Sequence, residues 1–301
     1  MASDLYYGGI EAGGTKFDCI VGRGPGEILA QARYRTSTPA ETLEQVVRFF
    51  RPFCQGHQIV AIGIGSFGPC DLTRGSPTYG FITSTPKPGW QYTDLVGVIG
   101  ASLSVPVAFD TDVNAAALGE HIWGASVGTR TSLYLTLGTG IGGGLIVDGI
   151  PLHGLQHPEM GHIRIPHDRE RDPFPGSCPF HADCFEGLAS GPAIRERFGR
   201  PGEQLDDADP FWELEAHYVA EAVSTCILVV SPQRIILGGG IMQRVALMPL
   251  IRQEVVRILA GYIEHDTTTR DISSYIVAPG LGTQSGVLGA IALAAASRDS
   301  V

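Results

Sequence analysis

A glycine-rich motif occurs twice in this chain of 301 residues, once near its start and once near its middle. In each copy two apolar runs flank a tight turn: Y-Y-G-G-I-E-A-G-G-T-K-F-D-C-I-V-G at Tyr6 to Gly22 and S-L-Y-L-T-L-G-T-G-I-G-G-G-L-I-V-D-G at Ser132 to Gly149. Apolar runs joined in this way are typical of β-hairpins. Because the copies stand in different halves of the chain, the sequence predicts two similar domains that face one another.

The chemistry of the two turns favours a phosphate ligand. Each turn contains a threonine hydroxyl (Thr15, Thr139), and Lys16 follows the first. A structural hairpin would explain either turn alone, whereas a matched pair offers backbone N–H donors and hydroxyls that together cradle phosphate oxygens. The Walker pattern G-x4-G-K-[ST] is absent. The residues expected to contact phosphate are Gly13, Gly14, Thr15, Lys16, Gly138, Thr139 and Gly140.

Three further loops are candidates for ligand contact. Ile59 to Ile64 reads as a buried strand that ends in G-S-F-G-P, and open α/β sheets bind ligands at the carboxyl ends of their strands. T-P-K-P-G-W carries Lys87 and is either a rigid surface turn or a ligand loop. Arg234 to Ile241 reads as a strand and a third glycine turn, placed to hold a base or ribose. The candidates are Gly65, Ser66, Phe67, Gly68, Pro69, Lys87, Gly238, Gly239 and Gly240.

A strand predicted at Val105 to Phe109 delivers two acidic residues, Asp110 and Asp112, to the start of an alanine-rich helix. Asp112 or Asn114 is expected to cap that helix, and capping alone would explain one acidic residue. The alternative is a catalytic base, because the strand ends at the same edge as the phosphate turns.

Two thiols and two imidazoles fall within the stretch from His157 to Glu186. Cys178, His181 and Cys184 follow the spacing C-x2-H-x2-C, and His162 precedes them. Zinc prefers four tetrahedral nitrogen and sulfur ligands, so this set predicts a closed, structural zinc site. A disulfide between the two cysteines is the alternative.

The composition of the chain argues against nucleic acids and membranes as binding partners. A net charge of −10 without basic runs argues against a nucleic-acid-binding surface. The N-terminus lacks a signal-peptide pattern, and glycines and polar residues interrupt the two long uncharged stretches, 131–147 and 272–297, so we expect a cytoplasmic chain that does not enter the membrane. The four remaining cysteines are scattered, as is typical of reduced thiols.

Apolar spacing predicts the remaining elements. We expect the last helix to pack against the first domain. The predicted helices are Pro39–Phe53, Gly187–Phe198, Pro210–Val230, Met248–Ile263 and Gly286–Ala296, and a strand is predicted at Ser274–Ala278.

Together these motifs resemble the ROK family of sugar kinases and repressors, within the actin-like ATPase superfamily. The resemblance covers nearly the whole chain and is strongest to the bacterial fructokinase branch, through I-E-A-G-G-T-K, T-P-K-P-G-W and C-P-F-H-A-D-C-F-E-G-L-A-S-G-P. It implies an α/β, two-domain actin-like (ribonuclease H-like) fold with an active-site cleft between the domains and a zinc-bound loop. The implied domains are residues 1–116 plus 285–301, and residues 117–284.

The resemblance also implies roles for individual residues. Asp112 would be the general base that accepts a proton from the sugar's terminal hydroxyl as that oxygen attacks the γ-phosphate of ATP, with Mg²⁺ bridging the phosphates. Thr111, Glu159, Glu186 and the second ring nitrogen of His162 would meet the hexose. Thr111 stands where the family commonly has asparagine, which weighs against glucose as the preferred sugar, and Glu11 stands where the family usually has aspartate.

The function expected from the resemblance is phosphorylation of D-fructose to fructose 6-phosphate, with hexose and ATP as small-molecule partners and a homodimer as the assembly. A glucokinase, mannokinase or broad hexokinase of the same family is the nearest alternative, because one or two hydroxyl contacts separate these enzymes. A non-catalytic sugar sensor would have no need of Asp112. An actin-like ATPase without a sugar substrate would have no need of Glu159, His162 and Glu186.

Overall fold

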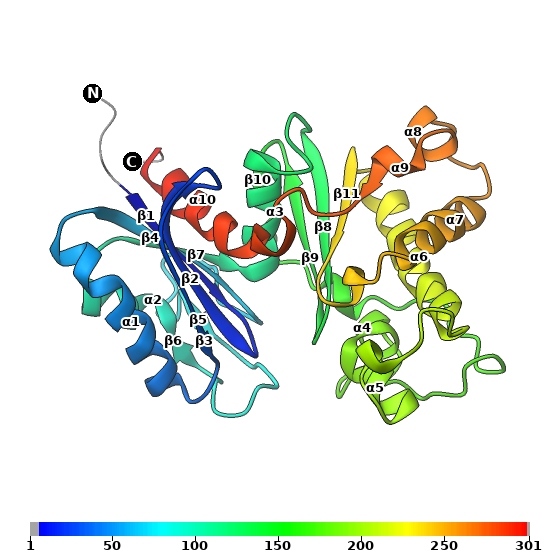
Figure 1. Ribbon diagram of the computed structural model, residues 1–301, viewed down its shortest axis with the longest axis horizontal. Helices are drawn as coiled ribbons and strands as arrows, with labels where there is room; N and C mark the ends of the chain where they lie inside the picture. Colours follow the sequence, from blue (N-terminus) through cyan, green and yellow to red (C-terminus); the bar gives the residue numbers. More distant parts are fainter. Residues whose placement is uncertain (1–5, 300–301) are drawn as a thin grey trace. The chain divides into compact units, whose positions relative to one another are not determined.

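Two five-stranded sheets organise residues 6–299, the part of the chain that the computed structural model describes (Figure 1). The first sheet has the order β3-β2-β1-β4-β7. The β1–β2 and β2–β3 pairs are antiparallel, and β1–β4 and β4–β7 are parallel. Its strands are β1 (Tyr6–Ala12), β2 (Lys16–Gly24), β3 (Glu27–Arg35), β4 (Ile59–Ser66) and β7 (Val107–Thr111).

The second sheet repeats this topology in the order β10-β9-β8-β11-β12. In both sheets the strand that comes first in the chain is central. The second and third strands lie on one side of it, and the fourth and fifth lie on the other side. The repeated hairpin predicted from the sequence is therefore part of a repeat of the whole sheet. Its strands are β8 (Thr131–Leu137), β9 (Ile141–Val147), β10 (Ile150–Pro151), β11 (Arg234–Gly238) and β12 (Ile276–Val277).

The chain forms two compact units, one of residues 1–128, 144–158 and 280–301 and one of residues 129–143 and 159–279. Residues 117–128, 144–158 and 280–284 thus lie in the first unit, whereas the sequence division placed them in the second. Helix α3 (Asp112–Trp123) continues past residue 116 and packs along α10 (Ser285–Asp299), which keeps its second half in the first unit. The functional division into domains, and the cleft between them, stay predictions.

Helices cover both faces of the first sheet (Figure 1). On one face α1 (Pro39–Gln55) and α2 (Leu95–Leu103) close a core that includes Phe17, Phe50 and Trp90. On the other face α10 packs against β1, β4 and α3, as predicted for the last helix. Small residues let it approach: a Cβ atom on Gly63 would lie 1.9 Å from the carbonyl oxygen of Ala290, a distance that no side chain tolerates.

The helices of the second unit follow β10 and β11 in the chain. The helix predicted over Gly187–Phe198 is divided in two by Ser190, whose hydroxyl accepts a hydrogen bond from the N–H of Ala193 and so caps the second part. The strand predicted at Ser274–Ala278 is shorter, because a helical turn, α9, occupies its start. The helices are α4 (Phe185–Ala189), α5 (Gly191–Phe198), α6 (Phe211–Val230), α7 (Leu247–Leu259), α8 (Asp266–Thr269) and α9 (Ile272–Tyr275).

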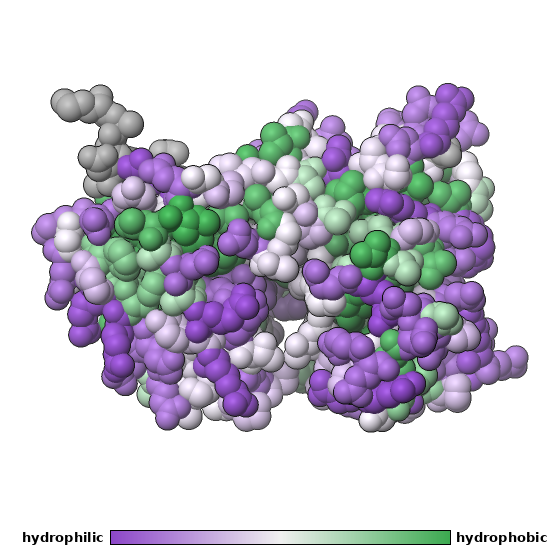
Figure 2. Space-filling model, in the orientation of Figure 1, coloured by the Kyte–Doolittle hydropathy of each residue, from purple (hydrophilic) through white to green (hydrophobic). Residues whose placement is uncertain are grey.

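The visible surface mixes polar and apolar groups, and α8 with its flanks forms a strongly hydrophilic projection of the second unit (Figure 2). Among residues 6–299 no helix combines the length and the apolar content that crossing a membrane requires. All six cysteines are free thiols, so the structure does not contain the alternative disulfide between Cys178 and Cys184.

Glu120 holds the chain where it re-enters the first unit. This side chain is fully buried, and its Oε2 accepts from the N–H groups of Ala125 at 2.7 Å and Gly280 at 2.9 Å. Its Oε1 accepts from the N–H of Leu281 at 3.0 Å and from the hydroxyl of Ser285 at 2.6 Å. One carboxylate on α3 therefore satisfies four donors, two of them next to the start of α10.

We expect Glu120→Ala to lower the free energy of unfolding by about 3 kcal/mol or more, because it leaves buried donors without an acceptor. Urea denaturation followed by circular dichroism measures this loss. Glu44→Gln is the matched control, since Glu44 is exposed and pairs with Arg48 on α1. A loss no larger than that of the control would show that the four hydrogen bonds do not stabilise the unit.

Candidate active site and metal centre

The first glycine turn joins β1 to β2. The N–H of Gly13 donates to the carbonyl of Lys16 at 2.9 Å, and the hydroxyl of Thr36 donates to the carbonyl of Gly13 at 2.8 Å, so the turn is held from within and from the end of β3. A Cβ atom on Gly14 would meet nothing within 4 Å, and Thr15 is exposed. Packing does not require glycine at position 14, which fits a turn that a ligand approaches closely.

Charged side chains surround this turn. Burial by itself raises the pKa of Asp18, but hydrogen bonds from Arg33 and Lys16, each 2.5 Å long, outweigh it and lower that pKa. Burial raises the pKa of Glu11, the last residue but one of β1, to about 7. The ammonium of Lys16 is thus already paired with Asp18, and its predicted contact with phosphate stays a prediction.

The second glycine turn, between β8 and β9, is tied to α4 and α5. The N–H of Gly138 donates to the carbonyl of Gly140 at 3.0 Å, and the N–H of Gly191 donates to the carbonyl of Gly138 at 2.8 Å. Directly after the turn, the N–H of Ile141 donates to Oε2 of Glu186 at 2.9 Å. One oxygen of Glu186 therefore holds the turn, a contact across 45 residues that its sequence neighbours do not reveal.

A cavity of about 630 Å³ lies within the second unit beside this turn. It brings together the predicted nucleotide contacts Gly138, Thr139 and Gly240, and the first residue of α5. Arg244 also lines the cavity, and it stacks on Trp212 with the guanidinium carbon 4.0 Å from the ring centre. The volume and the mixed lining suit a nucleotide-sized ligand.

The glycines of the third turn serve different purposes. A Cβ atom on Gly238 would lie 2.4 Å from the hydroxyl of Tyr134, and one on Gly239 would lie 2.2 Å from the carbonyl oxygen of Leu137. Both glycines therefore allow close packing of β11 against β8, and Gly239 also has a positive φ of 91°. Gly240 faces open space and lines the cavity, so it is the member of this turn whose lack of a side chain leaves room for a ligand.

The acidic segment after β7 places a carboxylate at the first position of α3. The expected cap was Asp112 or Asn114, and that prediction is wrong: Thr111 is the N-cap, and its hydroxyl accepts from the N–H of Asn114 at 3.2 Å. Capping by Thr111 leaves the carboxylate of Asp112 available for chemistry. Asp110 instead accepts from the side chain of Asn114 at 2.7 Å and contacts His153 at 2.9 Å.

Burial raises the pKa of Asp112 to about 6, while hydrogen bonds from the backbone N–H groups of Val113 and Asp112 itself and the nearby His157 act in the opposite direction. A carboxylate with this pKa is ionised at neutral pH and is still basic enough to accept a proton from a reacting hydroxyl. This combination is what the predicted role of Asp112 requires.

The G-S-F-G-P loop continues from the end of β4, next to α3. A Cβ atom on Gly65 would lie 2.6 Å from that of Ala115, so the strand end is packed against the helix. The hydroxyl of Ser66 is buried and donates to the carbonyl of Phe67 at 2.9 Å. The ring of Phe67 packs edge-on against Trp90, 5.7 Å between centres. The bond between Gly68 and Pro69 is cis.

Lys87 lies in the neighbouring T-P-K-P-G-W loop. Its carbonyl accepts from the N–H of Trp90 at 3.2 Å, and its own N–H donates to the hydroxyl of Thr85 at 3.4 Å. Among residues 6–299 its ammonium has no ion pair. The loop fixes the backbone and leaves the charge available to a ligand.

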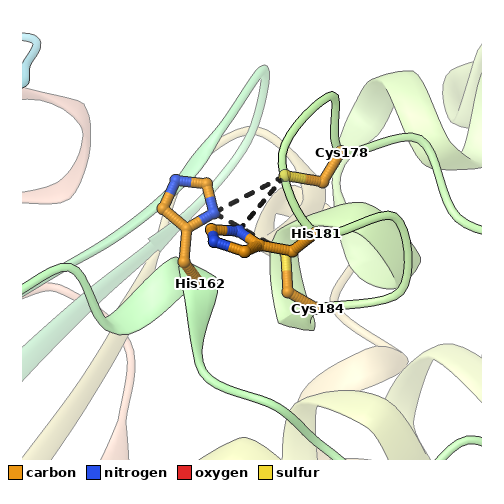
Figure 3. Close-up of side chains that lie close together, drawn as sticks. All are labelled: His162, Cys178, His181 and Cys184. Carbon is orange, nitrogen blue, oxygen red and sulfur yellow. Dashed lines mark hydrogen bonds between the residues drawn. The ribbon is translucent and has the colours of Figure 1, made fainter.

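The four predicted metal ligands converge in the second unit (Figure 3). Nδ1 of His162 lies 3.8 Å from Sγ of Cys178 and 3.6 Å from Sγ of Cys184, and Nδ1 of His181 lies 3.7 Å from Sγ of Cys178. Tetrahedral zinc with ordinary bond lengths would place a sulfur and a nitrogen ligand about 3.6 Å apart. The four atoms thus have the chemistry and the spacing of a structural zinc site.

The metal cluster lies beside the carboxylates predicted to meet the hexose. Glu186 follows Cys184 by two residues, and Glu159 precedes His162 by three, with the N–H of His162 donating to the carbonyl of Glu159 at 3.0 Å. Because Nδ1 of His162 faces the thiols, Nε2 points away from them (Figure 3). Both carboxylates thus lie within three residues of a metal ligand in the sequence, and their contact with a sugar stays a prediction.

Sequence reasoning named Glu11 only as a departure from the family pattern, and it missed two other features of the site. His157 lies two residues before Glu159 and is buried against the G-S-F-G-P loop. Arg244 and Trp212, which stack on one another in the lining of the cavity, are 32 positions apart in the chain. No local sequence pattern reveals that contact.

The chain is similar to known proteins over nearly its whole length. A model of the ROK family matches residues 7–297. A fructokinase of Zymomonas mobilis is 46% identical over 298 residues, which cover 97% of each protein. A glucokinase of Streptomyces coelicolor is 28% identical over 323 residues, covering 95% of this chain and 96% of that one. The crystal structure of a ROK family glucokinase from Streptomyces griseus in complex with glucose and AMPPNP superposes with a TM-score of 0.78 at 25% identity, covering 97% of this chain and 99% of that one. The chain therefore belongs to the ROK family.

Proposed function

We propose that this ROK protein is a fructokinase, which transfers the γ-phosphoryl group of ATP to the terminal hydroxyl of D-fructose and forms fructose 6-phosphate. The observation that carries the proposal is the much higher identity to a fructokinase than to a glucokinase over nearly the same length. The raised pKa of Asp112 and the three glycine turns supply the chemistry that such a transfer needs.

Asp112 acts as the general base. It stands at the first turn of α3, where its carboxylate accepts the proton of the attacking hydroxyl as the bond to phosphorus forms. Because its pKa of about 6 lies below neutral pH, the base is ready before the sugar binds. Thr111 serves this step by capping the helix, which fixes the position of the carboxylate.

The glycine turns bind ATP. Backbone N–H groups around Gly14 and Thr139 donate to phosphate oxygens, and the absence of side chains permits the contact. The cavity bordered by Gly240 and Arg244 receives the nucleoside. Mg²⁺ would accompany ATP and would supply positive charge that offsets the charge of the phosphates; it usually keeps most of its waters, so we assign it no protein ligand.

The hexose is held by polar groups whose positions the metal loop fixes. Glu159, Nε2 of His162 and the second oxygen of Glu186 accept or donate hydrogen bonds to sugar hydroxyls. Lys87, Thr111 and the loop Gly65–Pro69 complete the set from the first unit. Zinc would be held by Nδ1 of His162 and His181 and by the thiolates of Cys178 and Cys184, and its task is to keep this loop in place.

A panel of sugars tests the proposal. We expect kcat/KM for fructose to exceed the values for glucose, mannose and N-acylated hexosamines by about tenfold or more, because a site built for one set of hydroxyls leaves polar groups unpaired with another. Formation of ADP measures turnover on every sugar. Coupling through phosphoglucose isomerase then identifies fructose 6-phosphate.

A higher kcat/KM for glucose or mannose would show that the protein is a kinase whose preferred substrate is that sugar and not fructose. Binding of hexose without ADP formation would identify a sugar sensor. Hydrolysis of ATP that no sugar stimulates would identify an ATPase. We also propose a homodimer, which light scattering coupled to size-exclusion chromatography checks directly.

A further inference from the structure

His157 is buried in the first unit and is bound to the G-S-F-G-P loop. Its side chain is 7% exposed, and its Nε2 lies 3.1 Å from the backbone nitrogen of Cys70. A backbone N–H can only donate, so Nε2 is the acceptor and carries no proton. This buried hydrogen bond connects residues that are 87 positions apart in the chain.

The imidazole also lies close to Gly68 within the loop. A Cβ atom on Gly68 would lie 3.5 Å from Cε1 of His157 and 3.7 Å from its Nε2, so even a methyl group there would touch the ring. The thiol of Cys70 donates to the carbonyl of Phe67 at 3.2 Å, and the N–H of Phe67 donates to the carbonyl of Ala12 at 2.8 Å. His157 thus closes one end of a loop whose other end is tied to β1.

The same imidazole lies near the base. Both residues lie in the first unit, and a positive charge on the ring would lower the pKa of Asp112. Burial lowers the pKa of His157, which keeps the ring neutral and able to accept the hydrogen bond at neutral pH. Two residues later the chain reaches Glu159, a predicted hexose contact. One side chain therefore touches the loop and lies close to the base and to the segment that leads to the metal ligands.

We propose that His157 is a positioning residue for the hexose: its neutral Nε2 fixes the loop Gly65–Pro69 beside Asp112 through the amide of Cys70. The inference rests on the proposed function for the identity of the sugar, whereas the loop anchor itself does not. Without the acceptor, the buried Cys70 amide loses this hydrogen bond, and the loop loses the conformation that binds a sugar.

Two substitutions separate the hydrogen bond from the shape of the side chain. His157→Gln retains a polar acceptor close to the position of Nε2, and His157→Leu retains much of the bulk without an acceptor. We expect His157→Leu to raise KM for fructose about tenfold, because a lost buried hydrogen bond has an effect of this order, and to leave KM for ATP nearly unchanged. His157→Gln should restore most of the affinity for fructose. The exposed His57→Asn is the matched control, and it should behave like the wild type.

Hydrogen–deuterium exchange at the Cys70 amide gives a readout that does not depend on activity. Protection should fall in His157→Leu and remain in His157→Gln and His57→Asn. An unchanged KM for fructose in His157→Leu would overturn the proposal, even if the amide lost protection. A fall in melting temperature with equal losses for both substrates would also overturn it, since that pattern describes a general structural role.

If the wild-type protein phosphorylated no hexose, the proposed function would fail on its own. Equilibrium binding of fructose, measured by calorimetry on the same four proteins, would then replace KM. Weaker binding confined to His157→Leu would support the positioning role, and equal binding in all four proteins would refute it.

Discussion

Replacing Asp112 by asparagine is expected to lower kcat about 10³-fold while KM for fructose changes little. Asparagine keeps the size of the side chain and its hydrogen bond to the backbone but cannot accept the proton of the attacking hydroxyl. Steady-state kinetics with saturating ATP measure both constants. Turnover equal to that of the wild type would remove Asp112 from the mechanism.

The pH dependence offers a second check on the same residue. Because burial raises the pKa of Asp112 to about 6, kcat/KM for fructose should fall as the pH drops below that value, and this acidic limb should be missing from the residual activity of Asp112→Asn. Asp266→Asn, which removes an exposed carboxylate on α8, is the control and should retain both the rate and the limb.

The variant should also be more stable than the wild type. The folded pKa of Asp112 is raised above its unfolded value of 3.8, so the folded protein binds more protons between these two values, and stability falls as the pH rises through this window. Above pH 6 the full loss of folding free energy that comes from burying the ionised Asp112 is present. Asp112→Asn removes it, and we expect a gain of about 1–3 kcal/mol at pH 7.5, measured by urea unfolding. A catalytic base whose burial lowers the stability of the folded protein is typical of an active site.

Loss of the metal ligands is expected to have the second large effect. The purified protein should contain about one zinc ion per chain by elemental analysis, as the four converging ligands require. Replacing Cys178 and Cys184 together by serine should abolish zinc binding, lower the melting temperature and raise KM for fructose strongly, because structural zinc contributes folding free energy to the loop that it holds.

Cys54→Ser is the matched control, since Cys54 lies near the end of α1 in the first unit, whereas the four ligands belong to the second. Titration of the unfolded wild type without reductant should find six thiols, because no pair is bridged. Protein that lacks zinc after mild purification and keeps its activity and stability in strong chelators would contradict the metal site.

Much of the fold could be predicted because its signals are local. A glycine turn between two apolar runs specifies a hairpin over some 15 residues, and the two copies revealed the repeat of the sheets. The metal site could also be predicted, because three of its four ligands follow the spacing C-x2-H-x2-C within a single short loop. In contrast, β3 was missed: it is an edge strand whose exposed and half-buried residues alternate, with alanines at positions 30 and 32, so little hydrophobic contrast marks it.

The rest of the site depends on contacts between distant residues. Glu186 was predicted as a sugar ligand from its place beside Cys184, yet one of its oxygens binds the N–H of Ile141 and supports the second glycine turn. Thr111 was predicted as a sugar contact, and its hydroxyl caps α3. In both cases the residue type indicated a polar role but not the partner. The partner of Glu186 is chosen by the tertiary fold, and that of Thr111 lies three residues further along the chain.

The path of the chain has a consequence for its biosynthesis. The strands of the first sheet have all been translated once the ribosome passes Thr111, but the apolar face around Ile20 is covered by Val287, Leu288 and Ile291 of α10. The residues of the second unit are complete before that helix emerges. The unit that is begun first is therefore finished last, and until then the nascent protein carries an uncovered apolar surface, the kind of surface that chaperones bind.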